Sequence, residues 1–221
     1  MVNIMTLDEV KAKIDADGQW TMMASDDGIK TLRENLKARN FNVTVVENRE
    51  AALEELKKMI PENAEVMTGS STTLHEIGFM SHLFSGNHPW KSLVGEMVAE
   101  QDPEKQAEMR RQGILSEYFL ASANALTKGG QIVAAGLTGS RTGAFPFAAK
   151  NLVLVIGTQK IVKDIPAAME RVMEYVFPLE DARAKAEYNM NSAIGRWVIL
   201  EREPFNPNRV HIILVKEALG F

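Results

Sequence analysis

The 221-residue sequence contains no cysteine. Disulfide bonds, a cysteine nucleophile, thiolate-held zinc and a cysteine-ligated iron–sulfur cluster are therefore excluded. No apolar run approaches the roughly 18 residues of a membrane span. The N-terminal stretch MVNIMTLDEVKAKIDADG lacks the basic and apolar regions of a signal peptide. We therefore expect a cytoplasmic protein that does not enter a membrane.

The sequence also lacks a strong charge of either sign. Its net charge is -4 and it shows no basic stripe that could neutralise phosphates, so we do not expect nucleic acid as a partner. Hydrophobic residues make up 45% of the chain, which is enough for a substantial core. Because no linker, internal repeat or low-complexity tract is visible, we expect one α/β domain over residues 1–221, with the N-terminal helical segment 1–40 packed on it.

Several familiar catalytic signatures are missing as well. The chain has neither the Gly-Lys-Ser/Thr ending of a P-loop nor the dinucleotide-binding fingerprint nor the Gly-x-Ser-x-Gly elbow of hydrolases. The segment HEIGF begins like a zinc-protease motif, but Phe79 stands where the second histidine must be. We therefore expect no metal site.

The pattern that is present alternates between strand and helix. Segments 41–48 and 64–69 read as strands, while 49–60 and 71–83 read as helices. This alternation is typical of parallel strands joined by right-handed crossovers, so we expect a mainly parallel sheet. A first helix should begin after Thr6, because Glu9 stands at the spacing of a capping box.

The second half of the chain yields further strands. Segments 117–127 and 131–136 read as strands joined by a Lys128-Gly129-Gly130 hairpin turn. Segment 151–157, NLVLVIG, reads as a central strand that is covered on both faces. Segments 197–201 and 210–215 read as closing strands. A helix over 164–176, capped by Asp164, should bury one stripe of side chains: Ile165, Met169, Val172, Met173 and Val176.

One candidate binding loop follows the predicted strand 64–69. It contains Gly69, Ser70, Ser71, Thr72 and Thr73, and it leads directly into a helix. Free N–H groups at a helix N-terminus attract a phosphate or carboxylate. The alternative is that Ser71 or Thr72 only caps the helix, which this stretch by itself favours.

Glu76 is the one carboxylate close to this loop. It could act as an acid or base or pair with a cation on the ligand. It could equally be an acidic residue that the helix dipole favours in an early turn, and we prefer this second interpretation.

The other candidate loop follows the predicted strand 131–136. Gly136, Gly139 and Gly143 free its backbone, and Ser140 and Arg141 lie between them. Successive N–H groups in such a loop can form an anion-binding nest, and a guanidinium suits carboxylate or phosphate. A mobile turn with a solvated arginine is an equally good interpretation. If the two preceding strands lie side by side in a parallel sheet, both loops share one crevice at the carboxyl ends of the strands.

Segment 117–172, with GSSTTLHEIGF and NRVHIILVKEALGF elsewhere, resembles the LUD-domain family, the lactate utilization proteins of the LutC/YkgG type. The resemblance runs from about Leu32 onward. It implies a three-layer α/β fold of the NagB/RpiA/CoA transferase-like kind and a link to oxidation of L-lactate to pyruvate alongside iron–sulfur partner proteins. These positions match the family's characteristic residues: Gly69, Ser70, Thr73, Glu76, Asn124, Gly136, Gly139 and Arg141.

The sequence departs from the family pattern in one segment. Many relatives carry a cysteine-rich stretch before the last strands, whereas the corresponding stretch here, NMNSAIGRW, has no cysteine. A metal or redox role for this stretch is excluded, and direct electron transfer by the chain is put in doubt. The identity of a cofactor, the catalytic residue and a homo-oligomeric state remain open.

Three functions are compatible with these observations. The leading one is a LUD-domain protein that binds a small anionic metabolite or cofactor between the two loops, in lactate or related 2-hydroxy-acid metabolism. The second is a non-catalytic subunit of an iron–sulfur oxidase, contacting its partners through exposed apolar residues such as Trp90, Phe145 and Phe147. The third is an isomerase- or ligase-type enzyme acting on a sugar phosphate or folate, as in the wider fold superfamily. Whether the chain is an enzyme is left open.

Overall fold

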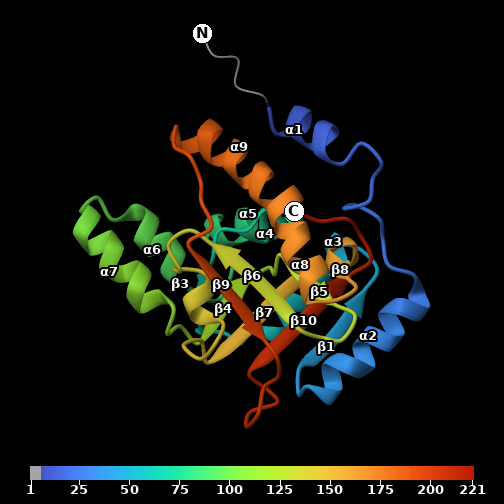
Figure 1. Cartoon of the computed structure of the whole chain (residues 1–221). Helices are drawn as coiled ribbons and strands as arrows, with labels where there is room; N and C mark the ends of the chain where they lie inside the picture. Colours follow the sequence, from blue (N-terminus) through green and yellow to red (C-terminus); the bar gives the residue numbers. More distant parts are fainter. Residues whose placement is uncertain (1–5) are drawn as a thin grey trace.

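A computed structural model describes residues 6–221 of the chain (Figure 1). Its larger sheet has six strands, all parallel. In spatial order they are β1 (Asn42–Val46), β10 (Val210–Val215), β7 (Asn151–Gly157), β4 (Tyr118–Ala121), β2 (Glu65–Thr68) and β3 (Lys91–Ser92). The prediction of a mainly parallel sheet is confirmed.

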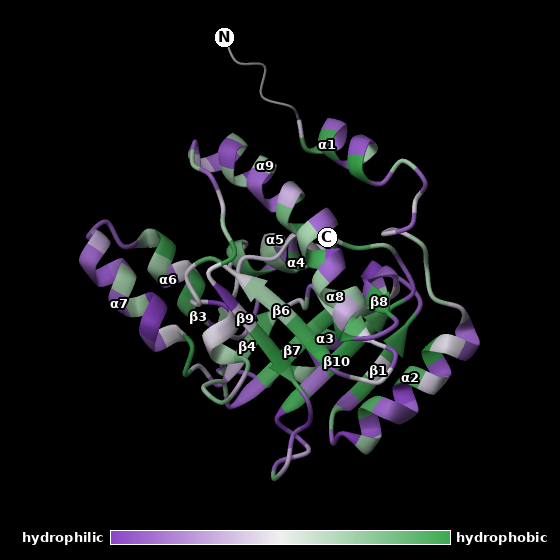
Figure 2. Cartoon of the chain, viewed as in Figure 1, coloured by the Kyte–Doolittle hydropathy of each residue, from purple (hydrophilic) through white to green (hydrophobic). Residues whose placement is uncertain are grey.

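Strand β7 lies in the middle of this sheet, as its continuous apolar sequence predicts. It pairs with β10 on one side and β4 on the other, and its residues 152–157 are all buried. The closing strand β10 inserts between β1 and β7, so the last strand of the chain is also buried in the sheet. Figure 2 shows these strands as the most hydrophobic part of the molecule.

Between α1 and strand β4 the chain forms six helices, which only partly match the predicted ones. They are α2 (Asp26–Ala38), α3 (Arg49–Met59), α4 (Thr72–Glu76), α5 (Phe79–Phe84), α6 (Leu93–Ala99) and α7 (Pro103–Gly113). The single helix expected over 71–83 is wrong, because Gly78 adopts a left-handed conformation with φ of 78° and separates α4 from α5. Strand β3 and helix α6 were not predicted.

A second, four-stranded sheet packs on the first. Its strands are ordered β8 (Ile161–Val162), β5 (Ala125–Thr127), β6 (Ile132–Gly136) and β9 (Arg196–Leu200). Leu126, Ile132 and Ala134 belong to the same core as the large sheet, whereas Ala125 and Val133 pack against Ala168 of α8 (Ile165–Arg171). Because alternate residues of a strand face opposite sides, the small sheet is buried on both faces. The three-layer α/β fold is confirmed.

The chain passes between the two sheets at Ser122, Ala123 and Asn124. The single strand predicted over 117–127 is therefore wrong: β4 belongs to the large sheet and β5 to the small one. The predicted turn between β5 and β6 is confirmed, because Gly130 has φ of 91° and its N–H donates to the Thr127 carbonyl at 2.8 Å.

A long C-terminal helical segment covers the small sheet. It consists of α8, a π-helical turn (Val172–Val176) and α9 (Phe177–Tyr188). Asp164 caps it as predicted, accepting from the Ala167 N–H at 3.0 Å. The predicted buried stripe is wrong at Met169 and Met173, which are 42% and 47% exposed. The buried face carries Ala168, Arg171 and Tyr175 instead, and neither alanine nor arginine marks a buried stripe in a hydropathy pattern.

Helix α1 (Leu7–Ile14) begins at the predicted capping box. Thr6 Oγ1 accepts from the Glu9 N–H, and Glu9 Oε2 accepts from the Thr6 N–H at 2.8 Å. Leu7, Val10 and Ile14 pack against Tyr175, Val176 and Leu179 of the C-terminal helical segment. The first five residues of the expected 1–40 segment lie outside the described residues. None of the helices in residues 6–221 combines the length and the hydropathy needed to cross a membrane.

Candidate functional site

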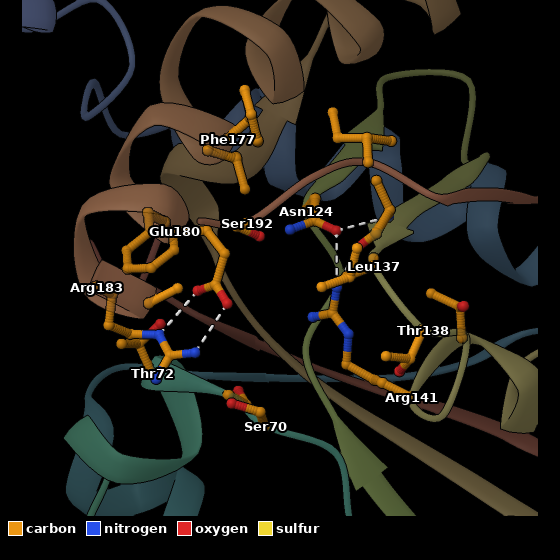
Figure 3. Close-up of a pocket in the computed structure, with 18 of the residues that line it drawn as sticks. Ser70, Thr72, Asn124, Leu137, Thr138, Arg141, Phe177, Glu180, Arg183 and Ser192 are labelled. Atoms are coloured by element: carbon orange, nitrogen blue, oxygen red, sulfur yellow. Dashed lines mark hydrogen bonds and ion pairs between the residues drawn. The ribbon is translucent and has the colours of Figure 1, made fainter. Parts of the chain in front are cut away.

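A cavity of about 420 Å³ opens where the two predicted loops meet helix α9 (Figure 3). This volume lies within the range of about 300–1,000 Å³ that is usual for sites of small molecules and cofactors. One wall is formed by Ser70 to Thr73, which follow β2, and another by Gly136 to Thr142, which follow β6. Phe177, Glu180 and Arg183 of α9 close the side opposite Arg141.

The two loops touch, although their strands are not neighbours. Strand β2 pairs with β3 and β4 in the large sheet, and β6 pairs with β5 and β9 in the small one. The condition that the two preceding strands lie side by side in one parallel sheet is therefore not met. Contact arises because Arg141 lies directly over Gly69: a β-carbon at position 69 would be 2.5 Å from Arg141 Cγ and 2.9 Å from Cδ.

Most of the residues predicted from the sequence meet at this cavity. Those that line it are Ser70, Ser71, Thr72, Thr73, Asn124, Gly136, Gly139, Ser140 and Arg141. Gly69 lies beneath Arg141 and does not itself line the cavity. Glu76 also lies outside it: its side chain is exposed and its Oε2 accepts from the Gly220 N–H at 2.7 Å.

Some backbone amides of the two loops are already hydrogen-bonded within the protein. Ser71 caps α4, accepting from the Leu74 N–H at 3.2 Å, and α4 is only five residues long. In the other loop, the Ser140 N–H donates to Thr138 Oγ1 and the Gly143 N–H donates to the Gly139 carbonyl at 2.7 Å. These amides are used inside their own segments, and the anion-binding nest stays a prediction. The positive charge of the site comes from side chains.

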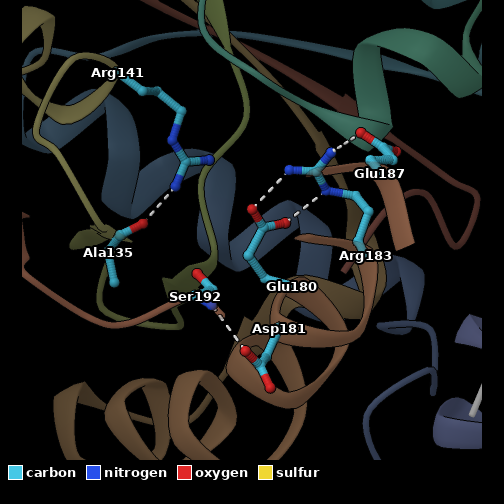
Figure 4. A network of polar contacts seen from close by, with 7 residues as sticks. All are labelled: Ala135, Arg141, Glu180, Asp181, Arg183, Glu187 and Ser192. Carbon is cyan, nitrogen blue, oxygen red and sulfur yellow. Dashed lines mark hydrogen bonds and ion pairs between the residues drawn. The ribbon is translucent and has the colours of Figure 1, made fainter. Parts of the chain in front are cut away.

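Arg141 supplies the first of these charges, and it is not a solvated arginine. Its Nη2 donates to the Ala135 carbonyl at 2.5 Å and to Asn124 Oδ1 at 3.1 Å, and its Nη1 donates to the Ser122 carbonyl at 3.4 Å (Figure 4 draws the first of these). Burial lowers the pKa of the Arg141 guanidinium, but arginine remains protonated in proteins. No carboxylate of residues 6–221 forms an ion pair with it.

Asn124 connects Arg141 to a second buried arginine. Its Oδ1 accepts from Arg141 Nη2 and from the Ala135 N–H at 2.8 Å, and its carbonyl accepts from Arg171 Nη1 at 2.6 Å. The Arg171 guanidinium lies 5.1 Å from the centre of the Tyr175 ring, and burial lowers its pKa to about 10. Arg171 Nε and Nη2 have no hydrogen-bond partner in the part of the chain that the structure describes.

Lys160 is the functional candidate that sequence reasoning missed. It ends the short turn Thr158–Lys160 that follows β7, it is 1% exposed, and it lines the cavity. Its Nζ donates to Thr73 Oγ1 at 3.0 Å and to Ser122 Oγ at 3.2 Å. Burial, followed by the nearby Arg171 and Arg141, holds the pKa of Lys160 well below its usual value. A lysine three residues after a buried strand was the available signal, because buried lysines are rare.

The outer part of the cavity holds a compensated group of charges. Arg183 binds Glu180 through two hydrogen bonds of 2.8 Å and also contacts Glu187 (Figure 4). Around the cavity there are four basic side chains (Arg110, Arg141, Lys160 and Arg183) against the single acidic Glu180. Because Arg183 is paired, the excess of positive charge comes from Arg110 and Arg141, which form no ion pair within residues 6–221.

The cysteine-free stretch 189–197 also reaches the cavity. Met190, Ser192, Ala193 and Ile194 line it, and the Ser192 N–H is held by Asp181 Oδ1 at 2.8 Å. In residues 6–221 no cluster of three or more histidine, aspartate or glutamate side chains is arranged to bind a metal ion.

The apolar residues expected at a partner interface are only partly exposed. Trp90 is 7% exposed and Phe145 is fully buried, so these two expectations are wrong. Trp90 packs against Phe79 and donates its indole N–H to the Ile60 carbonyl, which makes it a core residue. Phe147, at 88% exposed, is the one that projects from the surface.

Comparison with known proteins identifies the family of the chain and solved structures that are similar to it. The model of the LUD domain matches residues 29–215, which is most of the chain. The chain is similar to a solved structure of a DUF162 family protein from Deinococcus radiodurans, with 10% identity over 88% of this chain and 99% of that chain and a TM-score of 0.49. A comparison with curated proteins finds no match.

Proposed function

Because the chain belongs to the LUD-domain family, we propose that it binds a small anionic metabolite or cofactor in this cavity, in lactate or related 2-hydroxy-acid metabolism. The observation that carries the proposal is Arg141, a charged side chain at the cavity wall with no acidic partner in residues 6–221. A half-buried charge held only by carbonyl and amide oxygens is costly, and an anionic ligand would compensate it.

The surrounding groups support a carboxylate or phosphate as the charged part of the ligand. Ser70, Thr72 and Ser140 place hydroxyl groups on the walls that flank Arg141, and hydroxyl groups donate to such oxygens. A charge-assisted hydrogen bond contributes about 1.5–3 kcal/mol. Two of them, formed with the guanidinium, would be sufficient to orient a small acid in the cavity.

The size of the cavity favours a ligand larger than lactate itself. A cavity of about 420 Å³ lies in the range of drug-sized ligands, whereas lactate has only six non-hydrogen atoms. The apolar part of the lining comes from Val172, Val176 and Phe177 on one side. These side chains would contact the carbon skeleton of a longer acid or part of a cofactor.

Thermal-shift measurements with defined anions test this proposal. Lactate, pyruvate, a sugar phosphate and a CoA ester would be added separately to the wild type, to Arg141→Ala and to Arg33→Ala. Arg33 is an exposed residue of α2 outside the cavity, so it serves as the matched control. A ligand at a hundred times its Kd stabilises by about 2.7 kcal/mol, which raises Tm by roughly 5–10 °C for a chain of this size. At least one anion should shift the wild type and Arg33→Ala but not Arg141→Ala.

A second function, that of a non-catalytic subunit, is supported by the exposed Phe147. A chain without cysteine cannot hold an iron–sulfur cluster through thiolates, so electron transfer in such a complex would fall to its partners. Pull-down with candidate oxidase subunits would test it. Stable assembly that Phe147→Ser weakens and Arg141→Ala leaves unchanged would support this function over the first.

A further inference from the structure

We propose that Lys160 binds its ligand covalently, its amine condensing with the ketone of a 2-oxo acid whose carboxylate contacts Arg141. This inference rests on the proposed function, because it uses the same cavity, and it names the chemical class of the ligand. It is carried by the hydrogen bonds of Lys160, by the groups around them and by the position of Arg141.

The hydrogen bonds of Lys160 match a neutral amine. Thr73 Oγ1 lies 3.0 Å from Nζ and Ser122 Oγ lies 3.2 Å from it. Both hydroxyls donate their own hydrogens elsewhere, Thr73 to the Leu219 carbonyl and Ser122 to the Ala123 carbonyl, so both oxygens accept from Nζ. Two acceptors satisfy the two N–H groups of a neutral amine. A third acceptor, which an ammonium needs, is absent from the contacts of Nζ within residues 6–221.

The charged groups around Lys160 also oppose protonation. Arg171 of α8 and Arg141 of the loop after β6 act on it as like charges. Glu76 of α4 acts in the opposite direction, but its carboxylate is exposed and forms no ion pair with Nζ within the described chain. Burial has the largest effect and favours the neutral form. A desolvated lysine next to other cations is a recognised way to make a nucleophilic amine at neutral pH.

Ser122 brings the amine and the guanidinium to one place. Its Oγ accepts from Lys160 Nζ at 3.2 Å, and its carbonyl accepts from Arg141 Nη1 at 3.4 Å. A ligand that contacts both side chains therefore needs an electrophilic carbon close to an anionic group. A 2-oxo acid has this arrangement, because its ketone carbon is bonded directly to its carboxylate.

The chemical step balances without an oxidant or a reductant. The Nζ lone pair adds to the ketone carbon to form a C–N bond, and the C=O π pair moves to oxygen, which takes the first of the two amine protons. Nitrogen then loses its second proton to the new hydroxyl group, which leaves as water with the C–O bonding pair, and a C=N bond remains. The Thr73 and Ser122 hydroxyls contact Nζ and can exchange these protons. Lactate, which has no ketone, cannot react in this way.

Borohydride trapping tests the inference on the whole chain. The protein is incubated with pyruvate or 2-oxobutanoate at neutral pH, reduced with borohydride and analysed by intact mass and peptide mapping. Wild type should gain one ligand less water plus two hydrogens, located at Lys160. Lys163→Met removes an exposed lysine three residues further on and should label like wild type. Lys160→Met, and wild type incubated with lactate, should not label.

Each result is decisive. Peptide mapping of the wild type locates the adduct even if Lys160→Met folds poorly. No adduct with either 2-oxo acid, or an adduct spread over surface lysines, would overturn the inference. Thermal shift without borohydride separates this failure from failure of the proposed function. If an anion raises the Tm of the wild type but not of Arg141→Ala, and no adduct forms, the proposed anion site stands and the covalent step is refuted. If no anion raises Tm, the proposed function fails as well.

Discussion

The contact between Gly69 and Arg141 joins the two loops, and its effect on stability can be measured without a ligand. Gly69→Ala introduces a β-carbon 2.5 Å from Arg141 Cγ, 2.9 Å from Cδ and 3.0 Å from Cβ. Contacts this short cannot be kept, so the arginine stem must move. Arg141 Nη2 is held by Asn124 Oδ1 and the Ala135 carbonyl, and these hydrogen bonds resist the movement.

We expect Gly69→Ala to destabilise the protein by about 1–3 kcal/mol, as overpacking of a well-packed site does. Gly143→Ala is the matched control, because its β-carbon would meet only Ile114 Cδ1 at an ordinary 3.7 Å. That substitution should change the free energy of unfolding by less than about 1 kcal/mol. In an Arg141→Ala background the clashing Cγ and Cδ atoms are gone, so Gly69→Ala should cost about 1–2 kcal/mol less than in the wild type.

Urea unfolding of the four proteins of this double-mutant cycle measures the coupling. With slopes of about 1–3 kcal/mol/M, a change of about 2 kcal/mol moves the midpoint by roughly 1 M. Costs of Gly69→Ala that agree within about 0.5 kcal/mol in the two backgrounds would show that the residues are independent. Such a result would refute the contact between the loops on which the cavity depends.

Three further substitutions test other parts of the structure. Asn124→Leu leaves Arg141 Nη2 and the Ala135 N–H without their shared acceptor, so urea unfolding should show a loss of about 2–4 kcal/mol; a loss below about 0.5 kcal/mol would contradict the network. Glu203→Ala removes the carboxylate that lies 2.6 Å from Nε of the buried Arg209, so urea unfolding should show a loss of about 3–5 kcal/mol in the free energy of unfolding. A loss below about 1 kcal/mol, as for an exposed ion pair, would contradict the burial of this pair. Lys160→Met tests the pH dependence of stability, because burial lowers the pKa of Lys160 in the folded protein. Between that pKa and about 10.4 the unfolded state binds more protons than the folded state, so the stability of the wild type should rise with pH relative to that of the variant. Unfolding at pH 7 and pH 9.5 should show this rise, of at most about 1.4 kcal/mol per pH unit, and a constant difference would mean that the pKa is ordinary.

Local patterns in the sequence were sufficient for much of the fold. The capping residues Thr6 and Asp164 mark helix starts because a side-chain oxygen must meet free N–H groups nearby in the chain. The continuous apolar run of β7 identifies a central strand because both of its faces are covered. These signals depend only on residues a few positions apart.

Tertiary contacts decided what the sequence could not show. Ser122 and Asn124 alternate with alanines, as polar residues do in a strand. The passage from one sheet to the other at Ser122 to Asn124 therefore depends on which strands are available for pairing. Met169 and Met173 are as apolar as buried residues, yet the face that packs inward carries Arg171. A buried arginine is stabilised by distant partners such as the Asn124 carbonyl, which no periodicity reveals.

The candidate site also has a part that the sequence predicts and a part that it does not. Its loops were predictable, because glycine and hydroxyl residues after strands are visible in the sequence and the family resemblance points to the same positions. For Lys160 the sequence offers only its place after a buried strand, because the groups that surround its amine, Thr73, Ser122 and Arg171, come from three other parts of the chain. The two loops do line one cavity, but they come together through the contact of Arg141 with Gly69 and not through neighbouring strands.

The most direct test of the central claim is a crystal structure of the protein grown with the anion that raises Tm most in the thermal-shift series. We predict electron density for the ligand in the cavity, with its carboxylate or phosphate within hydrogen-bond distance of the Arg141 guanidinium and the rest of it extending toward Lys160. Density for the ligand at another surface, with the cavity between the two loops filled only by water, would contradict the account.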